Sequence, residues 1–382
     1  MLLVGFSASI LIIWMVLAGT RLRPFSPPPR LGVAALAPRP PGVVAVIPAR
    51  NEEETIGAVA GAHAATDYPG AFSLIVVDDH SSDATVARAA AAAAERLTIC
   101  EAPPLPAGWS GKLWAVNAGL ARAKDVAPDA EYVLLTDADI VLAPSTLSRL
   151  VAKAEESGAA LVSLMARLDA RGLWGGLLIP AFVYFFYKLY PFHLVNDPAQ
   201  PLAGAAGGCM LVRRDALDAI GGVQKINDRL IDDCALAQEI KSSGRAVWLG
   251  IAKNEAISLR DNRHLSSIWS MVARTAFTQL NHSWPLLAGT LIGMIVVYLA
   301  APAIALGFPL HGNAPAATIA AAAWALMALT YRPISRIYDQ APWKTFSLPI
   351  AALFYTLMTA SSALDHARGR GGAWKGRTYP AS

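Results

Sequence analysis

Two pairs of closely spaced carboxylates are the residues in this sequence best suited to chemistry. Asp137 and Asp139 end the apolar run 132–136, and Asp232 and Asp233 are adjacent further along the chain. Such a run predicts a buried strand, in which alternate residues point the same way. Asp137 and Asp139 would then project together at the carboxyl end of a strand, where open α/β sheets bind ligands. Two hard oxygen ligands there suit Mg²⁺ or Mn²⁺ carrying a diphosphate, and the alternative is an Asp-rich turn that closes the strand.

Asp232 and Asp233 also have two interpretations. The stretch 228–237 predicts the start of a helix, and the helix dipole alone favours carboxylates at that position. A carboxylate can equally act as a general base that takes a proton from an attacking hydroxyl group. The pair alone leaves both interpretations open.

Polar residues also follow the strand predicted at 42–47. The next segment, 48–55, is expected to be a turn in which Asn51 caps a helix that continues to about Ala65. Glu52 and its two acidic neighbours would then lie in the first helical turn, where the helix dipole favours negative charge.

A second strand is predicted at 72–77, and it ends in Asp78, Asp79 and, four residues later, Asp83. The carboxyl ends of parallel strands meet at one edge of a sheet. We therefore expect these carboxylates to lie close to Asp137 and Asp139.

Strands alternate with helices through the middle of the chain, which predicts an α/β fold with a mostly parallel sheet. The remaining elements expected there are helices at 84–96 and 147–157, strands at 97–100, 160–165 and 246–250, a helix that carries Lys112, Asn117 and Gly119, and a glycine-rich loop at 204–208 that leads into a strand.

The composition indicates a membrane protein. The 382 residues are 54% hydrophobic and 16% charged, well below the roughly 25% charged of soluble proteins. The net charge of +4 is too small to indicate a nucleic-acid partner. Three cysteines without paired spacing predict neither a disulfide framework nor a zinc site, which fits a reducing cytoplasmic location for the catalytic part.

The N-terminal segment 1–20 is uncharged and is followed by Arg21 and Arg23. Because the basic residues come after the apolar stretch, an uncleaved anchor with its N-terminus outside is favoured over a cleaved signal peptide. The proline-rich residues 21–41 predict a linker to a catalytic domain over 42–262.

Two further segments predict contact with the bilayer surface. Residues 172–187 are uncharged and aromatic but shorter than a span, so an interfacial helix is favoured over a buried one. A crossing there would separate Asp137 from Asp233. Residues 263–283 predict an amphipathic interface helix, because their apolar residues recur at helical spacing.

Residues 284–364 predict a C-terminal membrane region, followed by a basic tail over 365–382. The stretch 284–331 lacks charged side chains and is broken near 309–315, as in a helical hairpin. A further full span at 345–364 would leave the tail outside, against the positive-inside rule. A re-entrant or interfacial segment with a cytoplasmic tail is therefore favoured.

The ordered set of motifs over about 43–280 resembles the family 2 inverting glycosyltransferases with a GT-A fold. The matching residues are Ile47-Pro-Ala-Arg-Asn-Glu52, Val77-Asp-Asp-His-Ser-Ser-Asp83, Gly111-Lys112 with Asn117 and Gly119, Thr136-Asp-Ala-Asp139, Gly207-Gly208 with Arg213-Arg214, and Asp232-Asp233 with Leu236. The last pair departs from the usual Glu-Asp. The overall layout and residues 269–279 further resemble the bacterial membrane glycosyltransferases associated with hopanoid biosynthesis, which are relatives of the ceramide glucosyltransferases.

The resemblance implies transfer from a nucleotide sugar, with UDP favoured, to a lipid hydroxyl such as that of a hopanoid, at the cytoplasmic face of the inner membrane. It implies donor nucleotide binding by Pro48, Ala49, Asn51, Glu52, Asp78, Asp79, Lys112 and Asp137, metal binding (Mg²⁺ or Mn²⁺) by Asp137 and Asp139, catalysis by Asp233 and Asp232, and an acceptor side at Gly207, Gly208, Trp269 and Arg274. A solvated surface lysine is the alternative for Lys112, and membrane anchoring is the alternative for Trp269 and Arg274. The sequence does not indicate an oligomeric state.

Three other classes share some of these features. A nucleotidyl- or phosphotransferase with a GT-A-like fold would use the same metal chemistry, but it needs a basic pocket for a phosphate acceptor. A membrane-anchored receiver-like signalling module also has strand-end carboxylates and a lysine, but Lys112 precedes Asp137 in the chain and the pair at 232–233 would have no role. A non-catalytic membrane scaffold leaves the carboxylates unexplained.

Overall fold

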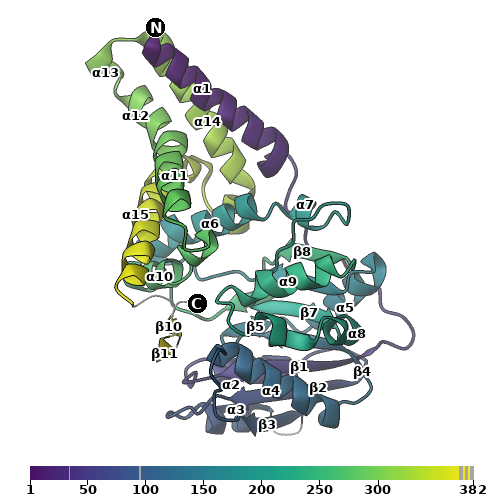
Figure 1. Ribbon diagram of the computed structural model, residues 1–382. Coiled ribbons are helices and arrows are strands. Elements are labelled where there is room, and N and C mark those ends of the chain that lie inside the picture. The colour runs from purple at the N-terminus through teal and green to yellow at the C-terminus, as the bar shows by residue number, and fades with distance from the viewer. Residues whose placement is uncertain (34, 94–95, 370–372, 375–376, 379–382) are drawn as a thin grey trace.

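The computed structural model describes residues 1–33, 35–93, 96–369, 373–374 and 377–378. A sheet-based domain lies at one end of the molecule and a bundle of long helices at the other (Figure 1). Of the predicted basic tail, residues 370–372, 375–376 and 379–382 lie outside the described residues, as do 34 and 94–95.

The domain predicted over 42–262 is built on a seven-stranded sheet. In spatial order its strands are β3 (Leu97–Glu101), β2 (Phe72–Asp78), β1 (Gly42–Ala49), β4 (Ala130–Thr136), β7 (Cys209–Arg213), β6 (Leu161–Met165) and β8 (Val247–Ile251). Strand β7 runs antiparallel to both of its neighbours, and all other neighbouring pairs are parallel. The prediction of an α/β fold with a mostly parallel sheet is confirmed.

Both faces of this sheet are covered, which explains the nearly continuous apolar runs of its strands. In β1, Val44 and Val46 belong to one hydrophobic core, whereas Val43 and Ala45 belong to the other. The helices of the domain are α2 (Ile56–Ala64), α3 (Thr85–Ala93), α4 (Gly111–Val126), α5 (Thr146–Ser157), α7 (Phe192–Val195), α8 (Arg214–Ala219) and α9 (Asp232–Ser242), with a 3₁₀ turn η2 (Gly222–Ile226).

A two-stranded antiparallel sheet was not predicted. It pairs β5 (Ile140–Leu142) with β9 (Ala256–Ser258), so that Ile140 lies opposite Ser258. Each strand has three residues, too few to show a sequence period. The pairing nevertheless fixes the segment that directly follows Asp139.

The expected role of Asn51 as a helix cap is wrong. Helix α2 begins only at Ile56, and Asn51 has a positive φ of 50°. The Asn51 side chain instead accepts a hydrogen bond from the backbone N–H of Ser82, at 2.9 Å. It therefore ties the loop after β1 to the loop after β2, and Glu52 lies in the turn before the helix rather than within it.

The linker predicted at 21–41 is partly docked on the domain. The backbone N–H of Ile251 donates to the carbonyl of Pro29 (2.9 Å), and Arg149 Nε donates to that of Gly32 (2.8 Å). Arg30 forms an ion pair with the buried Glu255 at 3.3 Å. These contacts hold the linker along the edge strand β8.

Five stretches among the described residues are long and apolar enough to cross a membrane: Leu2–Leu22, Gly172–Val195, Trp284–Leu306, Ala314–Ile337 and Pro342–Ala367. Their elements are α1 (Leu2–Leu17) with η1 (Ala18–Leu22), α6 (Gly172–Leu189) with α7, α11 (Trp284–Met294) with η4 (Ile295–Leu299) and α12 (Ala300–Leu306), α14 (Ala314–Ile337), and η5 (Pro342–Ser347) with α15 (Leu348–Ala367). The short helix α13 (Phe308–His311) joins α12 to α14 at the end of the bundle that lies far from the sheet (Figure 1).

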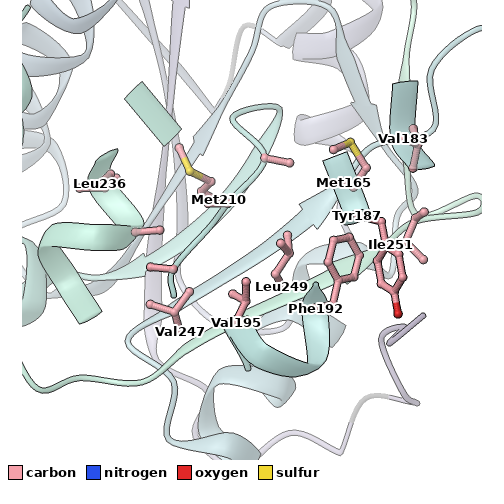
Figure 2. Close-up of a cluster of buried hydrophobic side chains, with 14 of the residues drawn as sticks. Met165, Val183, Tyr187, Phe192, Val195, Met210, Leu236, Val247, Leu249 and Ile251 are labelled. Carbon is pink, nitrogen blue, oxygen red and sulfur yellow. The ribbon is translucent and has the colours of Figure 1, made fainter. Parts of the chain in front are cut away.

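Helix α6 lies at the junction between the bundle and the sheet (Figure 1). It follows β6 and precedes β7, which are neighbours in one sheet, so both of its ends return to the same domain. Figure 2 shows that Tyr187 of α6 and Phe192 of α7 lie against Leu249 and Ile251 of β8, within one buried cluster. Helix α6 packs on the bundle as well: the Tyr184 hydroxyl lies 2.9 Å from that of Thr330 in α14, and the Tyr355 hydroxyl of α15 donates to the carbonyl of Leu178 at 2.9 Å. The helix therefore joins the two parts of the molecule, although its length and hydropathy alone would allow a span.

The last long segment, Pro342–Ala367, begins beside the sheet-based domain and ends beside the segment 263–283 that follows this domain. Just before it, Asp339 pairs with Arg167 at 3.0 Å and with Lys253 at 2.9 Å. Near its end, the Ser362 hydroxyl accepts a hydrogen bond from the backbone N–H of Phe277, at 3.0 Å. The segment therefore enters the bundle and returns to the side from which it came.

The amphipathic helix predicted over 263–283 is shorter than expected. It is divided into α10 (Leu265–Ala273) and a 3₁₀ turn, η3 (Thr278–Leu280). Ile268, Val272 and Phe277 are buried against other helices. Its apolar face is thus covered largely by protein.

Candidate active site

The two carboxylate pairs predicted from the sequence meet around Lys112. The Lys112 Nζ lies 2.9 Å from Asp137 Oδ1 and 3.1 Å from Asp232 Oδ2. Asp137 follows β4, and Asp232 opens α9. Lys112 is the second residue of α4, whose N-cap Ser110 accepts a hydrogen bond from the backbone N–H of Leu113.

The carboxylates determine the charge of Lys112. Burial lowers the pKa of Lys112, but Asp137, Asp232 and Asp233 raise it by more, so that it lies above its ordinary value. The ammonium group is therefore a permanent positive charge between the strand end and the helix start. This placement is inconsistent with the alternative of a solvated surface lysine.

Asp139 is held by the small sheet. Its Oδ2 accepts a hydrogen bond from the Ser258 hydroxyl at 2.9 Å, and its carbonyl accepts one from the backbone N–H of Leu259 at 2.8 Å. Burial and the nearby charge of Asp137 raise the pKa of Asp139. Two carboxylates that repel each other in this way would be stabilised by a cation between them.

Asp137 and Asp139 fit a divalent metal as a partial ligand set. Among the described residues, no group of three or more His, Cys, Asp and Glu side chains is arranged to hold a metal ion by itself. Mg²⁺ commonly takes only one or two protein carboxylates and fills its other positions with phosphate oxygens and water. The pair is therefore suited to a metal that arrives with a diphosphate.

Asp233 has the environment of a general base. Its Oδ2 accepts a hydrogen bond from the backbone N–H of Gly207 at 2.8 Å, and its Oδ1 accepts one from that of Cys234 at 2.7 Å. Burial and the adjacent Asp232 raise the pKa of Asp233 to about 6, although Lys112 and the two N–H groups oppose the rise. A carboxylate with a pKa near neutrality can be ionised and still accept a proton effectively.

The glycine-rich loop reaches this carboxylate through its backbone. A Cβ atom added to Gly207 would lie 3.4 Å from both Asp233 Oδ2 and Lys112 Nζ. Gly208 is fixed differently, because its carbonyl accepts a hydrogen bond from the Thr136 hydroxyl at 2.8 Å. The loop thus connects the end of β4 with the start of α9.

A small pocket opens at this point. Lys112, Asp137 and Asp232 supply its charged groups, and the apolar side chains of α4, α9 and η2 supply most of its remaining wall. Pro48 and Gly207 also line it. The pocket joins the carboxylate cluster to the end of β1, where the predicted donor residues begin.

The predicted donor residues lie together at the ends of β1 and β2. Ala49 pairs with Asp78 in the sheet register, and its carbonyl accepts a hydrogen bond from the backbone N–H of Asp79 at 2.8 Å. The Asp79 carboxylate is buried and lies 3.7 Å from Arg50 Nη1. The Asp78 carboxylate accepts a hydrogen bond from the backbone N–H of Ser81 at 3.2 Å and so shapes this loop.

Glu52 is held in the same region through its backbone, whose N–H donates to the Thr85 hydroxyl at 2.8 Å. The predicted donor residues from Pro48 to Asp79 are therefore neighbours, as the strand order requires.

The two predicted acceptor-side residues from 263–283 differ in position. The Trp269 Nε1 donates a hydrogen bond to the Ser361 hydroxyl of α15 at 3.1 Å, which links two membrane-side helices. Arg274 lies near the carboxylates: burial and Arg260 lower its pKa, whereas Asp137, Asp232 and Asp233 oppose this. Its buried Nε has no hydrogen-bond partner among the described residues. Arg274 thus offers an unused donor beside the cluster, and Trp269 packs between helices.

The sequence interpretation missed Ser258 and Tyr190. Ser258 hydrogen-bonds to Asp139, and the Tyr190 hydroxyl contacts the side chain of Cys234, next to Asp233. Both roles depend on contacts between distant parts of the chain. Neither residue lies in a motif that could have indicated them.

Residues 44–221 match the sequence model of the family described as Glycosyl transferase family 2. The match covers a little less than half of the chain and likens this region to a family 2 glycosyltransferase domain. The predicted enzyme class, a glycosyltransferase, is thereby confirmed, and the donor loops, Lys112 and the glycine-rich loop all fall inside the match. The match ends before Asp232 and Asp233, so their roles rest on the geometry described above.

Two solved structures resemble this chain to different extents. The mannosyltransferase PcManGT from Pyrobaculum calidifontis, in complex with GDP-Man and Mn²⁺, is 20% identical with a TM-score of 0.56, over 93% of this chain and 99% of that one. Glucosyl-3-phosphoglycerate synthase from Mycobacterium tuberculosis, in complex with Mg²⁺ and UDP, is 22% identical with a TM-score of 0.42, over 63% of this chain and 79% of that one. The first likeness, together with the family match, confirms the predicted GT-A fold. No curated protein matches the sequence significantly.

Proposed function

We propose that this glycosyltransferase is a membrane-bound, inverting enzyme that moves a sugar from a nucleotide sugar to the hydroxyl group of a lipid. The observation that carries the proposal is the meeting of three groups beside the pocket that Lys112, Asp137 and Asp232 line. These are a carboxylate pair suited to a metal–diphosphate, a lysine that bridges carboxylates, and a buried aspartate with a raised pKa.

The donor would bind along the ends of β1, β2 and β4. Its nucleoside would contact the loop residues from Pro48 to Glu52 and the buried Asp79, and Asp78 would shape the loop from beneath. The motifs favour a UDP-sugar, and PcManGT, which shares the fold, is described in complex with GDP-Man and Mn²⁺. Lys112, which lies between Asp137 and Asp232, would add positive charge beside the diphosphate.

Asp137 and Asp139 would hold Mg²⁺ or Mn²⁺, with Asp139 as the more direct ligand because Ser258 orients it. A metal bound there would neutralise the charge that grows on the leaving nucleoside diphosphate. Arg274, with an unused N–H group among the same carboxylates, would contribute further positive charge on the acceptor side.

Asp233 would take the proton of the acceptor hydroxyl while that oxygen attacks the anomeric carbon. The Gly207 and Cys234 N–H groups hold its two oxygens in place. The bond to the diphosphate breaks on the opposite face of the sugar in the same step, so an α-linked donor gives a β-glycoside. The proton moves to Asp233, and no covalent sugar–enzyme intermediate is formed.

A lipid acceptor is supported by the position of the site beside a helical bundle that has four apolar segments besides α6. Within this class we propose a hopanoid or a similar hydroxylated lipid, on the resemblance of the whole layout. The catalytic domain would face the cytoplasm at the inner membrane, where nucleotide sugars are available.

The test uses membranes that contain the full chain, incubated with a panel of nucleotide sugars and a native lipid extract, with products identified by mass spectrometry. We expect a glycolipid product that requires Mg²⁺ or Mn²⁺, and loss of that product in Asp139→Ala and Asp233→Asn. The matched control is Asp125→Asn, which changes an exposed carboxylate outside the site. Full activity of both site variants, or transfer to a phosphate group instead of a lipid hydroxyl, would overturn the proposal.

A further inference from the structure

We infer that Tyr190 and Gln279 form a polar clamp that holds the acceptor hydroxyl next to Asp233. The inference rests on the proposed function and assigns the acceptor side to two residues that belong to neither carboxylate pair. Tyr190 follows the end of α6, and Gln279 lies in η3, so both come from the elements at the junction with the bundle.

The Tyr190 ring is fixed in position. Its backbone N–H donates to the carbonyl of Phe186 at 2.8 Å, which ends α6. The ring packs against Gly204, where an added Cβ atom would lie only 2.8 Å from Tyr190 Cδ1. A glycine at the start of the glycine-rich loop therefore makes room for this ring. The hydroxyl group is held at a defined point above the loop that also carries Gly207.

The hydroxyl group and the amide of Gln279 face each other. The Tyr190 hydroxyl lies 3.2 Å from Gln279 Oε1 and 3.0 Å from Gln279 Nε2. A primary amide has two N–H donors and an oxygen with two lone pairs, and a phenol has one donor and two lone pairs. Their mutual contact leaves part of this capacity unused, so the pair can bind a further hydroxyl group without breaking apart.

The clamp lies beside Cys234, the residue that directly follows the proposed base. The Tyr190 hydroxyl lies near the thiol of Cys234. Cys234 directly follows Asp233 and supplies one of the N–H groups that hold its carboxylate. The Cys234 thiol also contacts the carbonyl of Ala205 at 3.4 Å. A hydroxyl group bound by the clamp would thus lie close to Asp233.

The surroundings of the clamp match an amphipathic acceptor. The rings of Tyr190 and Phe186 are tilted against each other with centroids 5.1 Å apart, and both pack against the apolar cluster that extends through the junction. Gln279 is fixed from the bundle, because the backbone N–H of Phe277 is bonded to Ser362 of α15. The polar groups thus lie between an apolar rim and the carboxylates, which suits a lipid whose hydroxylated end enters first.

The experiment separates acceptor binding from donor chemistry. Tyr190→Phe removes the hydroxyl group but keeps the ring on Gly204, and Gln279→Leu removes the amide. For each variant we would measure initial rates against graded amounts of the native lipid extract that the wild type glycosylates. The KM for the donor and the slow hydrolysis of the donor without lipid would be measured in parallel.

Both variants should raise the apparent KM for the acceptor about tenfold, as expected from the loss of one or two hydrogen bonds to a ligand. The KM for the donor and the rate of donor hydrolysis should stay within about twofold of the wild type, since the clamp does not contact the donor residues. The melting temperature should stay within a few degrees of the wild type. Tyr187→Phe is the matched control, because it removes a hydroxyl group one helical turn earlier on α6, and it should change none of these quantities.

An unchanged acceptor KM in both variants would overturn the clamp while leaving the proposed function intact. A fall in donor hydrolysis as large as the fall in transfer to the lipid would also overturn the clamp. Tyr190 and Gln279 would then affect the donor chemistry as well as acceptor binding. If the wild type neither transfers nor hydrolyses any nucleotide sugar, the proposed function itself fails.

Discussion

Asp233 combines two features that a general base requires: a defined orientation and a pKa close to the working pH. Two backbone N–H groups orient its carboxylate, while burial and Asp232 raise its pKa to about 6. An aspartate in water would be ionised at that pH but would be a weaker base. Burial thus makes Asp233 a better proton acceptor, while Lys112 and the N–H groups limit the rise.

This environment predicts the pH dependence of transfer. Because the proposed base Asp233 would act in its ionised form and its pKa is raised to about 6, kcat/KM should rise with pH up to about 6 and level off above it. In Asp233→Asn this limb should disappear, and transfer should fall by about 10²–10⁴-fold. The measurement is the rate of product formation between pH 4.5 and 8.5.

Asp125→Asn, an exposed change, should keep the wild-type profile and serves as the control. If kcat/KM of Asp233→Asn still rises with pH up to about 6, the group that titrates there is not Asp233.

At the scale of elements, helix α4 positions Lys112 because it packs very closely on the sheet. Its Gly119 faces Val46 of β1 and Val77 of β2, and an added Cβ atom would lie 2.8 Å from Val77 Cγ2 and closer still to Val46. The glycine of the predicted motif thus contributes packing rather than ligand binding. It brings the helix, and with it Lys112, down to the ends of these strands.

Gly119→Ala is therefore expected to lower the free energy of unfolding by about 1–3 kcal/mol, the usual cost of overpacking a core. Gly61→Ala in α2 is the matched control: the nearest atom to its new Cβ would be 3.8 Å away, and alanine is the better helix former. The measurement is chemical denaturation of the detergent-solubilised protein. Equal stability of the two variants would contradict the packing role of Gly119.

Elements with a strong local pattern could be predicted from the sequence, and those defined by long-range pairing could not. Strand periodicity and the order of the motifs were enough to predict the strands β1, β2 and β4 and the carboxylates that follow them. Strands β5 and β9 exist because they pair with each other across more than 100 residues. Asn51 was misassigned because its side chain bonds to a loop 31 residues away. Ser258 and Tyr190 were not predicted as site residues for the same reason, since their partners come from distant segments.

At the scale of the whole molecule, the catalytic domain and the bundle are joined at several points. Arg167 and Lys253 pair with Asp339 directly after α14, and α15 contacts η3 through Ser362. Trp14 of α1 donates a hydrogen bond to the carbonyl of Val297 at 2.9 Å, so the N-terminal helix also belongs to the bundle. These contacts orient the pocket relative to the membrane helices.

The course of the chain through this bundle predicts its membrane topology. If α1 crosses from outside to inside, α11–α12 and α14 cross out and back, and Arg332 and Arg336 come to lie inside with Arg21 and Arg23. The segment 342–367 starts near Asp339 and ends near Phe277, both beside the catalytic domain. Between these points its Phe346 carbonyl accepts a hydrogen bond from Trp324, in the middle of α14. A re-entrant segment of this kind places the tail inside, in agreement with the positive-inside rule.

We therefore expect a fluorescent protein that folds only in the cytoplasm to be bright when fused after Ser382, and alkaline phosphatase fused there to be inactive. Inserted at Gly312, next to α13 at the far end of the bundle, the two reporters should give the opposite result. A truncation fused after Leu280, directly behind the catalytic domain, is the control for a cytoplasmic position. Active phosphatase after Ser382 would mean that 342–367 crosses the membrane completely. The contacts of Asp339 and Ser362 with the domain could then not both exist in the membrane-embedded protein, because the two residues would lie on opposite sides.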